Sequence, residues 1–367
     1  MQGGRSRDLI MFSISDIPRL RLVAQQLAGT AITTTTDIVS YFGAMQAQDH
    51  AMCKWAVGAR IPVTEPQVQA ALDNADLIRT HVLRPTWHLI APADARWMLA
   101  LTAPHIRRQY MSMIRKQGID EDFLKHSDRK IERLLRDHNY LTREEIMAHI
   151  ALPGTMPNDI RPSAVMMNAE LMGIVCNGPM RGKQHTYALL EERIAPAKAL
   201  TRQESLATLA ERYFTSHGPA TLQDLIWWSG LGVTDARQAL EFVKDKFLSF
   251  VAGGVVYYMH ENTARHVPAG DTIHFLPAFD EFLISYTDRT ASIPLAQQAS
   301  AFTRNGIFKP IITVNGIVVG IWKRTGKKNT MHIEPEFFGR VGKARQHTIL
   351  AHAEHYGTFM GMKVSIA

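Results

Sequence analysis

Two glutamines separated by a single residue, Gln46 and Gln48, form the most informative pair in the 367-residue sequence. Side chains two residues apart point about 200° apart on an α-helix but to the same side of an extended segment. The two amides can therefore act together only where the backbone is not helical. Because amides are neutral and weakly basic, such a pair would position a reactant by hydrogen bonds and would not abstract a proton.

The residues around the pair allow an extended backbone. Gly43 can end a preceding helix and Asp49 can cap a following one, which leaves residues 44–48 as a short extended link. The alternative is that Gln46 is an ordinary surface residue and Asp49 only a helix cap. The residues alone leave both interpretations open.

The common enzyme signatures are absent from the sequence. It has no glycine-rich phosphate loop followed by Lys-Ser or Lys-Thr, no His-Glu-x-x-His and no Gly-x-Ser-x-Gly, which excludes the common NTPases, zincins and α/β-hydrolases. His352 and His355 have the spacing of half a metal site on a helix, but histidines near a helix C-terminus also suit the helix dipole. We expect no metal and no cofactor.

Composition indicates a soluble protein of two or three domains. The chain carries 41 Lys and Arg against 34 Asp and Glu, a formal charge of +7 that favours a polyanionic partner. No long uncharged apolar run predicts a membrane span. Cys53 and Cys176 are the only cysteines, too few for a disulfide framework or a zinc-thiolate site, although one pairing stays open.

Several helices followed by a two-stranded ribbon, the pattern of a winged helix, recur three times. The first copy has helices from Asp16, Asp37 and Met52 and over 65–74, with a ribbon over 77–80 and 86–90. The second has helices over 128–138, 142–150 and 162–173, with a ribbon over 174–176 and 186–190. The third has helices over 204–216, 221–228 and 234–245, with a ribbon over 247–250 and 255–259.

The last hundred residues change to a β pattern. Strands over 308–314 and 317–322 are joined by Asn315-Gly316, the strongest short hairpin signal, a third strand follows over 329–333, and a helix over 347–359 closes the chain. We predict an α+β fold of three tandem winged-helix domains with a C-terminal β-rich, barrel-like domain. The expected limits are a disordered leader over 1–12, winged helices over 13–118, 119–200 and 201–270, and the β-rich domain over 271–367.

Basic residues concentrate where a winged helix approaches phosphates, at the start of a recognition helix and on wings. For any one of them, the alternative is a solvated surface charge. The candidates for DNA binding outside the first ribbon are Arg161 and Ser163 at the second recognition helix, Arg181 and Lys183 on its wing, and Lys323, Arg324, Lys327 and Lys328 at the terminal hairpin.

Three segments together resemble one known family. Gln46-Ala-Gln48, Arg79-Thr-His81 with the run 84–92, and the run 276–289 look like the bacterial AlkZ-like DNA glycosylases, over nearly the whole chain after residue 13. That resemblance implies tandem winged helices that remove N7-alkylated purines and unhook interstrand crosslinks. Its motif is Gln-x-Gln in crosslink-acting members and Gln-x-Asp in a sister group, and this chain matches the former.

The resemblance also implies a mechanism. An N7-alkylated guanine is cationic and already a good leaving group, so Gln46 and Gln48 need only position a water beside an oxocarbenium-like sugar. An uncharged base would need acid catalysis that amides do not supply. A bulky crosslink would need an open channel in place of a deep pocket.

Further residues follow from the same resemblance. Arg79, His81, Arg84 and His88 on the first ribbon are expected to contact DNA, with contacts to each other as the alternative for the last three. Asp280 and Glu281 are candidates to line the channel, with a helix cap or a structural ion pair as the alternative. We expect a cytoplasmic, nucleoid-associated monomer that binds double-stranded DNA and no membrane. The alternatives are a non-catalytic DNA-binding protein, such as a regulator or architectural protein, and winged helices that serve protein contacts.

Overall fold

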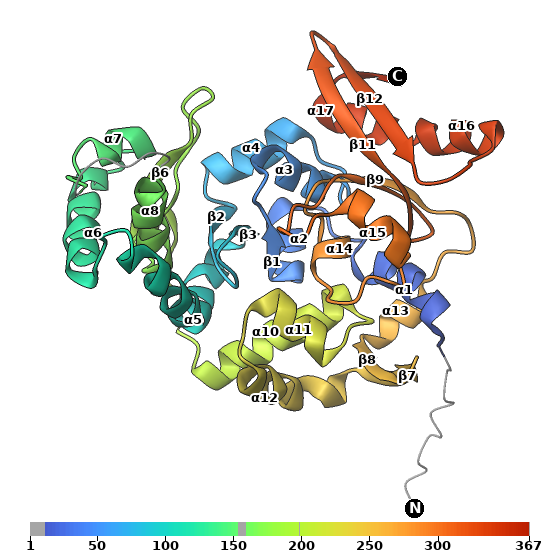
Figure 1. Ribbon diagram of the computed structural model, residues 1–367, viewed down its shortest axis with the longest axis horizontal. Helices are drawn as coiled ribbons and strands as arrows, with labels where there is room; N and C mark the ends of the chain where they lie inside the picture. The colour runs from blue at the N-terminus through green and yellow to red at the C-terminus, as the bar shows by residue number, and fades with distance from the viewer. Residues whose placement is uncertain (1–11, 153–158, 198, 367) are drawn as a thin grey trace, which may run out of the picture.

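Three units with the same order of elements build most of the chain, and a curled five-stranded sheet completes it (Figure 1). The computed structural model describes residues 12–152, 159–197 and 199–366. In each unit a helix leads through a short strand segment into two further helices and a β-hairpin. The fold is therefore α+β, as predicted.

The first unit sits at the centre of the molecule. It is preceded by η1 (Ile14–Asp16) and α1 (Ile17–Ala24). Its elements are α2 (Thr35–Phe42), β1 (Ala44–Gln46), α3 (His50–Gly58), α4 (Glu65–Asp73), β2 (Ile78–His81) and β3 (Trp87–Ile90), with the strands in the order β1-β3-β2.

The second unit follows the long helix α5 (Ala95–Arg115), which starts after η2 (Pro92–Asp94). It consists of α6 (Glu121–Leu135), β4 (Leu141–Thr142), α7 (Arg143–Met147), α8 (Arg161–Leu171), β5 (Val175–Asn177) and β6 (Thr186–Leu189), with the strands in the order β4-β6-β5. The short helix α9 (Leu190–Arg193) follows β6 at the end of this unit.

The third unit has a two-stranded sheet with an isolated bridge. It consists of α10 (Arg202–His217), α11 (Leu222–Ser229), α12 (Val233–Val243), η3 (Lys244–Lys246), β7 (Leu248–Ala252) and β8 (Val255–Met259). Ala220, just before α11, makes an antiparallel bridge to Tyr258 of β8, at the place that β1 and β4 occupy in the other units.

The C-terminal part adds the sheet β13-β12-β11-β10-β9. After α13 (Glu261–Arg265) come β9 (Ile273–Leu276), α14 (Glu281–Ile284), α15 (Leu295–Ala301), β10 (Ile311–Val314), β11 (Ile317–Lys327), β12 (Thr330–Phe337), α16 (Lys343–Ala351), α17 (Glu354–Met360) and β13 (Lys363–Ile366). The expected Asn315-Gly316 turn joins β10 to β11, and both residues take the positive φ that such a turn needs.

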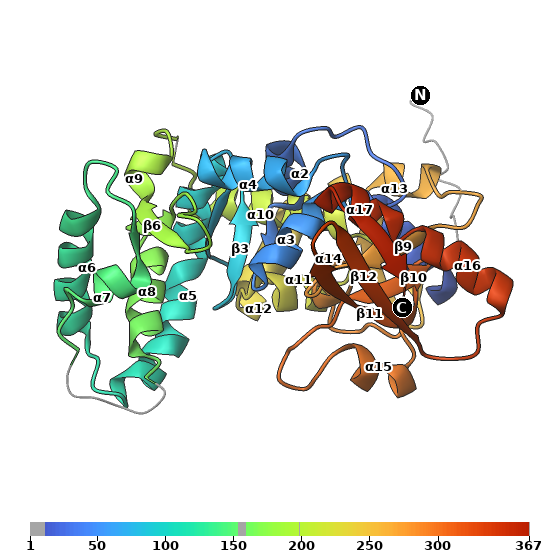
Figure 2. The same cartoon turned by 90° about the horizontal axis from the view of Figure 1, so that it is seen from above.

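The sheet of the first unit is covered on both faces, which fixes its position. Ala44 and Ile90 on one face belong to the core shared with α10 and α11 of the third unit. Met45 and Leu89 on the other face belong to the core shared with α3 and the C-terminal sheet. The second unit has a core of its own and lies at one end of the molecule, as Figure 2 shows.

Some expected elements differ from the structure. The single closing helix is two helices, α16 and α17, and the parallel strand β13 after them was not predicted. Helix α6 starts at Glu121, earlier than expected, because Asp120 caps it by accepting a hydrogen bond from the amide of Phe123. Of the expected leader, residues 1–11 lie outside the described residues, while Phe12 packs against Phe250 with ring centroids 5.1 Å apart.

Candidate active site

The link between α2 and α3 is extended, as the Gln46 and Gln48 pair requires. Gly43 ends α2 with φ of 81°, a conformation that glycine adopts without strain. The Asp49 carboxylate caps α3 by accepting hydrogen bonds of 3.0 Å from the amides of Ala51 and Met52. Between them β1 pairs with β3 over residues 44–46, so the predicted extended segment is confirmed as far as Gln46, and Gln48 lies in a bend before α3.

Gln46 belongs to a polar row that crosses the central sheet. It pairs with His88 of β3, which pairs in turn with Thr80 of β2, so the three side chains lie side by side on one face. All three are buried, with exposed fractions of 5% for Gln46 and 0% for His88 and Thr80. Ala44 and Ile90, two residues away on the same face, are packed in an apolar core.

Each member of this row has a polar atom without a hydrogen-bond partner among the described residues: Gln46 Oε1, His88 Nε2 and Thr80 Oγ1. His88 Nδ1 lies 2.9 Å from the Thr86 carbonyl and therefore carries the proton, which leaves Nε2 as an acceptor. Burial, aided by the charge of Arg84, lowers the pKa of His88 to about 3. Because buried polar atoms are nearly always paired, such a row is typical of a site that a ligand or water completes.

Glu281 holds the backbone of Gln46. Its carboxylate accepts hydrogen bonds from the Gln46 amide at 2.6 Å, from Trp228 Nε1 at 3.1 Å and from the Ser285 hydroxyl, and His217 Nε2 lies 3.4 Å away. Burial by itself would raise the pKa of Glu281, but His217, Ser285 and the Gln46 amide outweigh burial and hold that pKa at about 2. The group is a buried carboxylate that stays ionised.

Arg84 supplies positive charge beside the row. Its Nε and Nη2 atoms are buried and have no hydrogen-bond partner among the described residues. Burial lowers the pKa of Arg84, and the opposing charge of Glu281 raises it in part. The site therefore combines a fixed anion, a fixed cation and three polar side chains whose hydrogen-bonding capacity is not used up.

Gln48 lies two residues beyond the buried row and is exposed. Between the two glutamines, the amide of Ala47 donates to the Trp87 carbonyl at 2.7 Å, and its carbonyl accepts from Arg79 Nε at 3.1 Å. The link thus continues along the edge of the sheet until Asp49 starts α3. One amide of the pair faces the interior and the other solvent.

Besides His88 of the polar row, four expected DNA-contacting or channel-lining residues differ from the expectation of an exposed contact, because they are buried and bonded inward. His81 pairs with the carboxylate of Glu170, and the Arg161 side chain donates hydrogen bonds of 2.7 and 2.8 Å to the Asp159 carboxylate. Asp280 caps α14 and forms a two-pronged ion pair with Arg60, both bonds 2.9 Å, so its structural alternative holds. Glu281 does not line a surface channel and instead clamps Gln46.

The other basic candidates lie on or near the surface. Lys183, Lys323, Lys327 and Lys328 are exposed. Arg181 is exposed and paired with Glu145, and Ser163 is exposed and accepts a hydrogen bond from Arg143 at 3.0 Å. Arg324 is half-buried and donates to the Tyr356 hydroxyl at 2.9 Å.

A family model described as DNA glycosylase AlkZ-like matches residues 39–359, which include the polar row, the Glu281 clamp and the hairpin β11–β12. The chain belongs to the AlkZ-like DNA glycosylase family. The resemblance predicted from three sequence segments is confirmed, and with it the class of enzyme, a DNA glycosylase.

Two comparisons with individual proteins agree with this family. An interstrand DNA cross-link repair glycosylase of Streptomyces sahachiroi is 23% identical over 318 residues, which are 83% of this chain and 85% of the relative. The solved structure of Streptomyces sahachiroi DNA glycosylase AlkZ superposes with a TM-score of 0.78 at 20% identity, over 98% of this chain and all of that one. The two proteins share a fold.

Several residues of this AlkZ-like site had no signal in the sequence. His217 and Trp228 come from α10 and α11 of the third unit, and both contact Glu281. Glu170 holds His81 from α8 of the second unit. Each is an ordinary helical residue by its spacing, and only the tertiary packing brings it to the first unit.

The described part of this glycosylase contains no cluster of metal ligands and no exposed thiol. No group of three or more His, Cys, Asp or Glu side chains there could hold a metal ion. Cys53 and Cys176 are free and buried, and burial raises their pKa values to about 11 and about 12. Among residues 12–152, 159–197 and 199–366, no helix combines the length and apolar character needed to cross a bilayer.

Proposed function

We propose that this chain hydrolyses the N-glycosidic bond of cationic N7-alkylated purines in double-stranded DNA, including purines held in interstrand crosslinks, and acts as a monomer. The polar row of Gln46, His88 and Thr80 carries this proposal, because its unpaired atoms lie beside the family motif. The name of the Streptomyces relative, an interstrand cross-link repair glycosylase, supports the crosslink as a substrate.

In this mechanism the attacking water lies at the boundary between the buried Gln46 and the exposed Gln48, and the two amides hold it from the interior side and the solvent side. Gln46 Oε1 is a free acceptor that can bind one water hydrogen, and Glu281 fixes its backbone from behind. A fixed hydrogen-bonding group at the reacting centre lowers the barrier without reorganising during the reaction. The ionised carboxylate also favours positive charge that develops on the sugar, while the charged leaving base needs no acid.

The proposal also takes the three units to be winged helices that bind along the DNA duplex. Their shared order of helix, strand, two helices and hairpin supports this assignment. Wings and hairpin tips would then meet phosphates, through Arg181 and Lys183 on the second unit and Lys323, Lys327 and Lys328 on β11 and its turn. Arg324 follows Lys323 on β11, and Ser163 is an exposed residue of α8 in the second unit.

The proposal is tested by single-turnover release of base from a duplex with one N7-methylguanine, read as strand breaks after alkali. We expect release by the wild type, and a rate about 100-fold lower for Gln46→Ala and for Gln48→Ala with DNA affinity nearly unchanged. Gln203→Ala is the matched control, because Gln203 is an exposed amide on α10 of the third unit and should have no effect.

The possible outcomes separate the parts of the proposal. If excess wild-type protein binds the duplex but releases no base, the proposed activity is wrong and the alternative of a non-catalytic DNA-binding protein is favoured. If Gln46→Ala and Gln48→Ala each release the base as fast as the wild type does, the glycosylase activity is confirmed and the proposed role of the two glutamines is wrong. A crosslinked duplex in the same assay tests the wider substrate range.

A further inference from the structure

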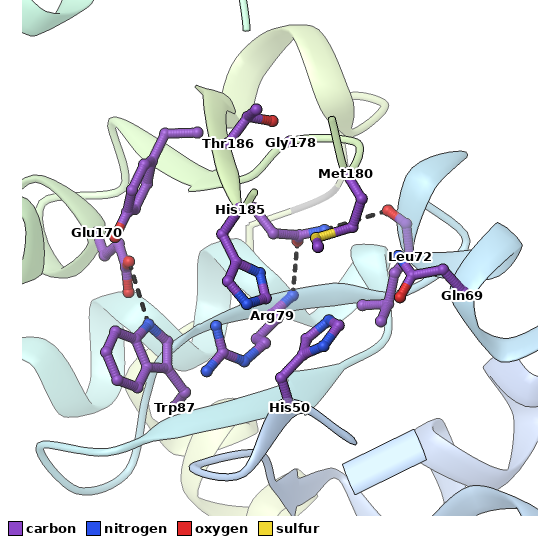
Figure 3. Close-up of a pocket in the computed structure, with 12 residues that line it drawn as sticks. His50, Gln69, Leu72, Arg79, Trp87, Glu170, Gly178, Met180, His185 and Thr186 are labelled. Carbon is purple, nitrogen blue, oxygen red and sulfur yellow. Dashed lines mark hydrogen bonds between the residues drawn. The ribbon is translucent and has the colours of Figure 1, made fainter. Parts of the chain in front are cut away.

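A pocket outside the polar row lies where the first unit meets the second (Figure 3). His50, the first residue of α3, and Arg79 of β2 come from the first unit, and His185 comes from the turn between β5 and β6. The rings of His50 and His185 meet edge to face across the junction, with centroids 4.5 Å apart. His50 is two residues from Gln48 in the chain, whereas Arg79 and Trp87 lie on the face of the sheet opposite the polar row, so the pocket and the row are connected through the link 46–50.

Arg79 provides an immobilised positive charge in this pocket. Its Nε donates to the Ala47 carbonyl at 3.1 Å, and its guanidinium lies over the Trp87 ring at 4.5 Å. Figure 3 shows the guanidinium between Trp87 and the two imidazoles. The terminal nitrogens Nη1 and Nη2 make no hydrogen bond or ion pair within the described part of the chain.

The acidic groups near the pocket are already engaged. The Glu170 carboxylate is bonded to His81 and accepts from Trp87 Nε1 at 3.3 Å. Asp49 caps α3, and the carboxylate of Glu65 pairs with Lys54. None of these carboxylates binds the Arg79 guanidinium, although Glu170 lines the same pocket, so the terminal nitrogens of Arg79 stay open to an anion.

The two histidines supply hydrogen-bond donors without a further positive charge. Burial, the neighbouring His185, Lys54 and Arg79 lower the pKa of His50 to about 3, and burial with Arg79 and Lys54 also lowers the pKa of His185. Both rings are neutral near neutral pH, and a neutral imidazole keeps one N–H donor. Arg79 and two ring N–H groups form a set that matches the oxygens of a phosphate.

The packing around Trp87 makes a nucleobase an unsuitable ligand for this pocket. A base would need an open aromatic face for stacking. The Trp87 ring is covered by Arg79 at 4.5 Å, and the His81 ring also packs against it, with centroids 4.5 Å apart. The pocket offers donors and charge, and its aromatic surface is in use.

We propose that Arg79, His50 and His185 form a binding site for one backbone phosphate of the DNA, next to Gln48. This inference rests on the proposed function, because that function supplies DNA as the ligand. A phosphate held there would bridge the first and second units and fix the strand near the exposed Gln48.

The test measures binding of an unmodified duplex by fluorescence anisotropy and needs no base release. In a series of duplexes, each phosphate in turn is replaced by an uncharged methylphosphonate. We expect one position to weaken wild-type binding about tenfold, and the same position to have a clearly smaller effect on the variant that combines His50→Ala with His185→Ala, which keeps only Arg79 at the site. Arg79→Gln should lower the slope of log affinity against log salt by about one.

His266→Ala is the control, because His266 is an exposed histidine after α13 in another part of the molecule, and thermal unfolding of each variant checks its fold. The site is overturned if that position weakens binding by the double variant as much as by the wild type, or if the wild type does not bind the duplex. A response of the two imidazole signals to inorganic phosphate, with no sensitive position in the duplex, would assign the pocket to a free anion and overturn the DNA contact. Wild type that binds as predicted but releases no base would refute the proposed function and leave the phosphate site standing.

Discussion

The first and second units use the same place in their fold in different ways. In both, the last residue of a short strand donates its backbone amide to a carboxylate: Gln46 to Glu281 at 2.6 Å, and Thr142 to Glu145 at 2.7 Å. Glu145 lies three residues further along the same chain segment and is half-buried. Glu281 is 235 residues away and buried. A local helix cap in one unit corresponds to a tertiary clamp in the other.

The side chains at the end of the short strand also differ between the two units. In the second unit Thr142 accepts a hydrogen bond from the Glu145 amide at 3.2 Å, and its partner across the sheet, Thr186, donates to the Pro179 carbonyl at 2.6 Å. In the first unit Gln46 and His88 keep unpaired atoms. Where the second unit satisfies its polar groups for stability, the first leaves them available, which is expected of a functional site.

The connection to the next helix is also longer in the first unit. Thr142 is itself the cap of α7, and in the third unit Ala220 is followed at once by the cap Thr221. In the first unit Ala47 and Gln48 stand between the paired residue and the cap Asp49. These two extra residues place a second amide, Gln48, at the surface, while the first, Gln46, is buried.

The largest effect that would test this comparison is expected for Glu281→Gln. Removing one partner of a buried charged network leaves the others unpaired, so the free energy of unfolding should fall by about 3 kcal/mol. Base release should slow as well, because the Gln46 amide loses its anchor. Urea unfolding and single-turnover release measure the two effects, and Glu145→Gln in the second unit is the matched change, which should leave base release unaffected.

The effect of Glu281→Gln on stability should depend on pH. The pKa of Glu281 in the folded protein is about 2, below its ordinary value of 4.5, so the ionised form stabilises the fold. The difference between wild type and variant is therefore complete above about pH 4.5 and is lost as the pH falls toward 2. A difference that grew on acidification would contradict the ionised clamp.

Local features of this comparison could be predicted from the sequence. Gly43 and Asp49 bracket the extended link because a positive φ and an amide acceptor are properties of single residues. The Thr142 and Glu145 capping box and the Asn315-Gly316 turn are likewise settled within four residues. Short-range signals of this kind do not depend on the rest of the fold.

The long-range part could not be predicted, for a physical reason. Charged residues such as Arg161 and His81 are mostly exposed by type, and they are buried here only because Asp159 and Glu170 compensate them. The partner of Glu281 is a backbone amide, which any residue has. Neither pairing leaves a periodicity or spacing in the sequence that could reveal it.

A smaller effect, on rate and not on stability, is expected at His88. His88→Leu removes the Nε2 acceptor beside Gln46 and should slow base release about tenfold, whereas His88→Gln can present an acceptor at a similar place and should keep most of the rate. Because the pKa of His88 is about 3, its protonation should cause no step in the rate profile near neutral pH. Equal losses in the Leu and Gln variants would argue against the acceptor.

The smallest effect should come from the corresponding place in the second unit. Thr142→Ala removes the side-chain cap of α7, which is expected to cost about 1 kcal/mol of stability. The rate of base release and the DNA affinity should not change, because Thr142 and Thr186 direct their side chains to partners within their own unit. If Thr142→Ala slowed base release as much as His88→Leu does, the two units would share one function, and the unpaired atoms of the first would not mark the active site.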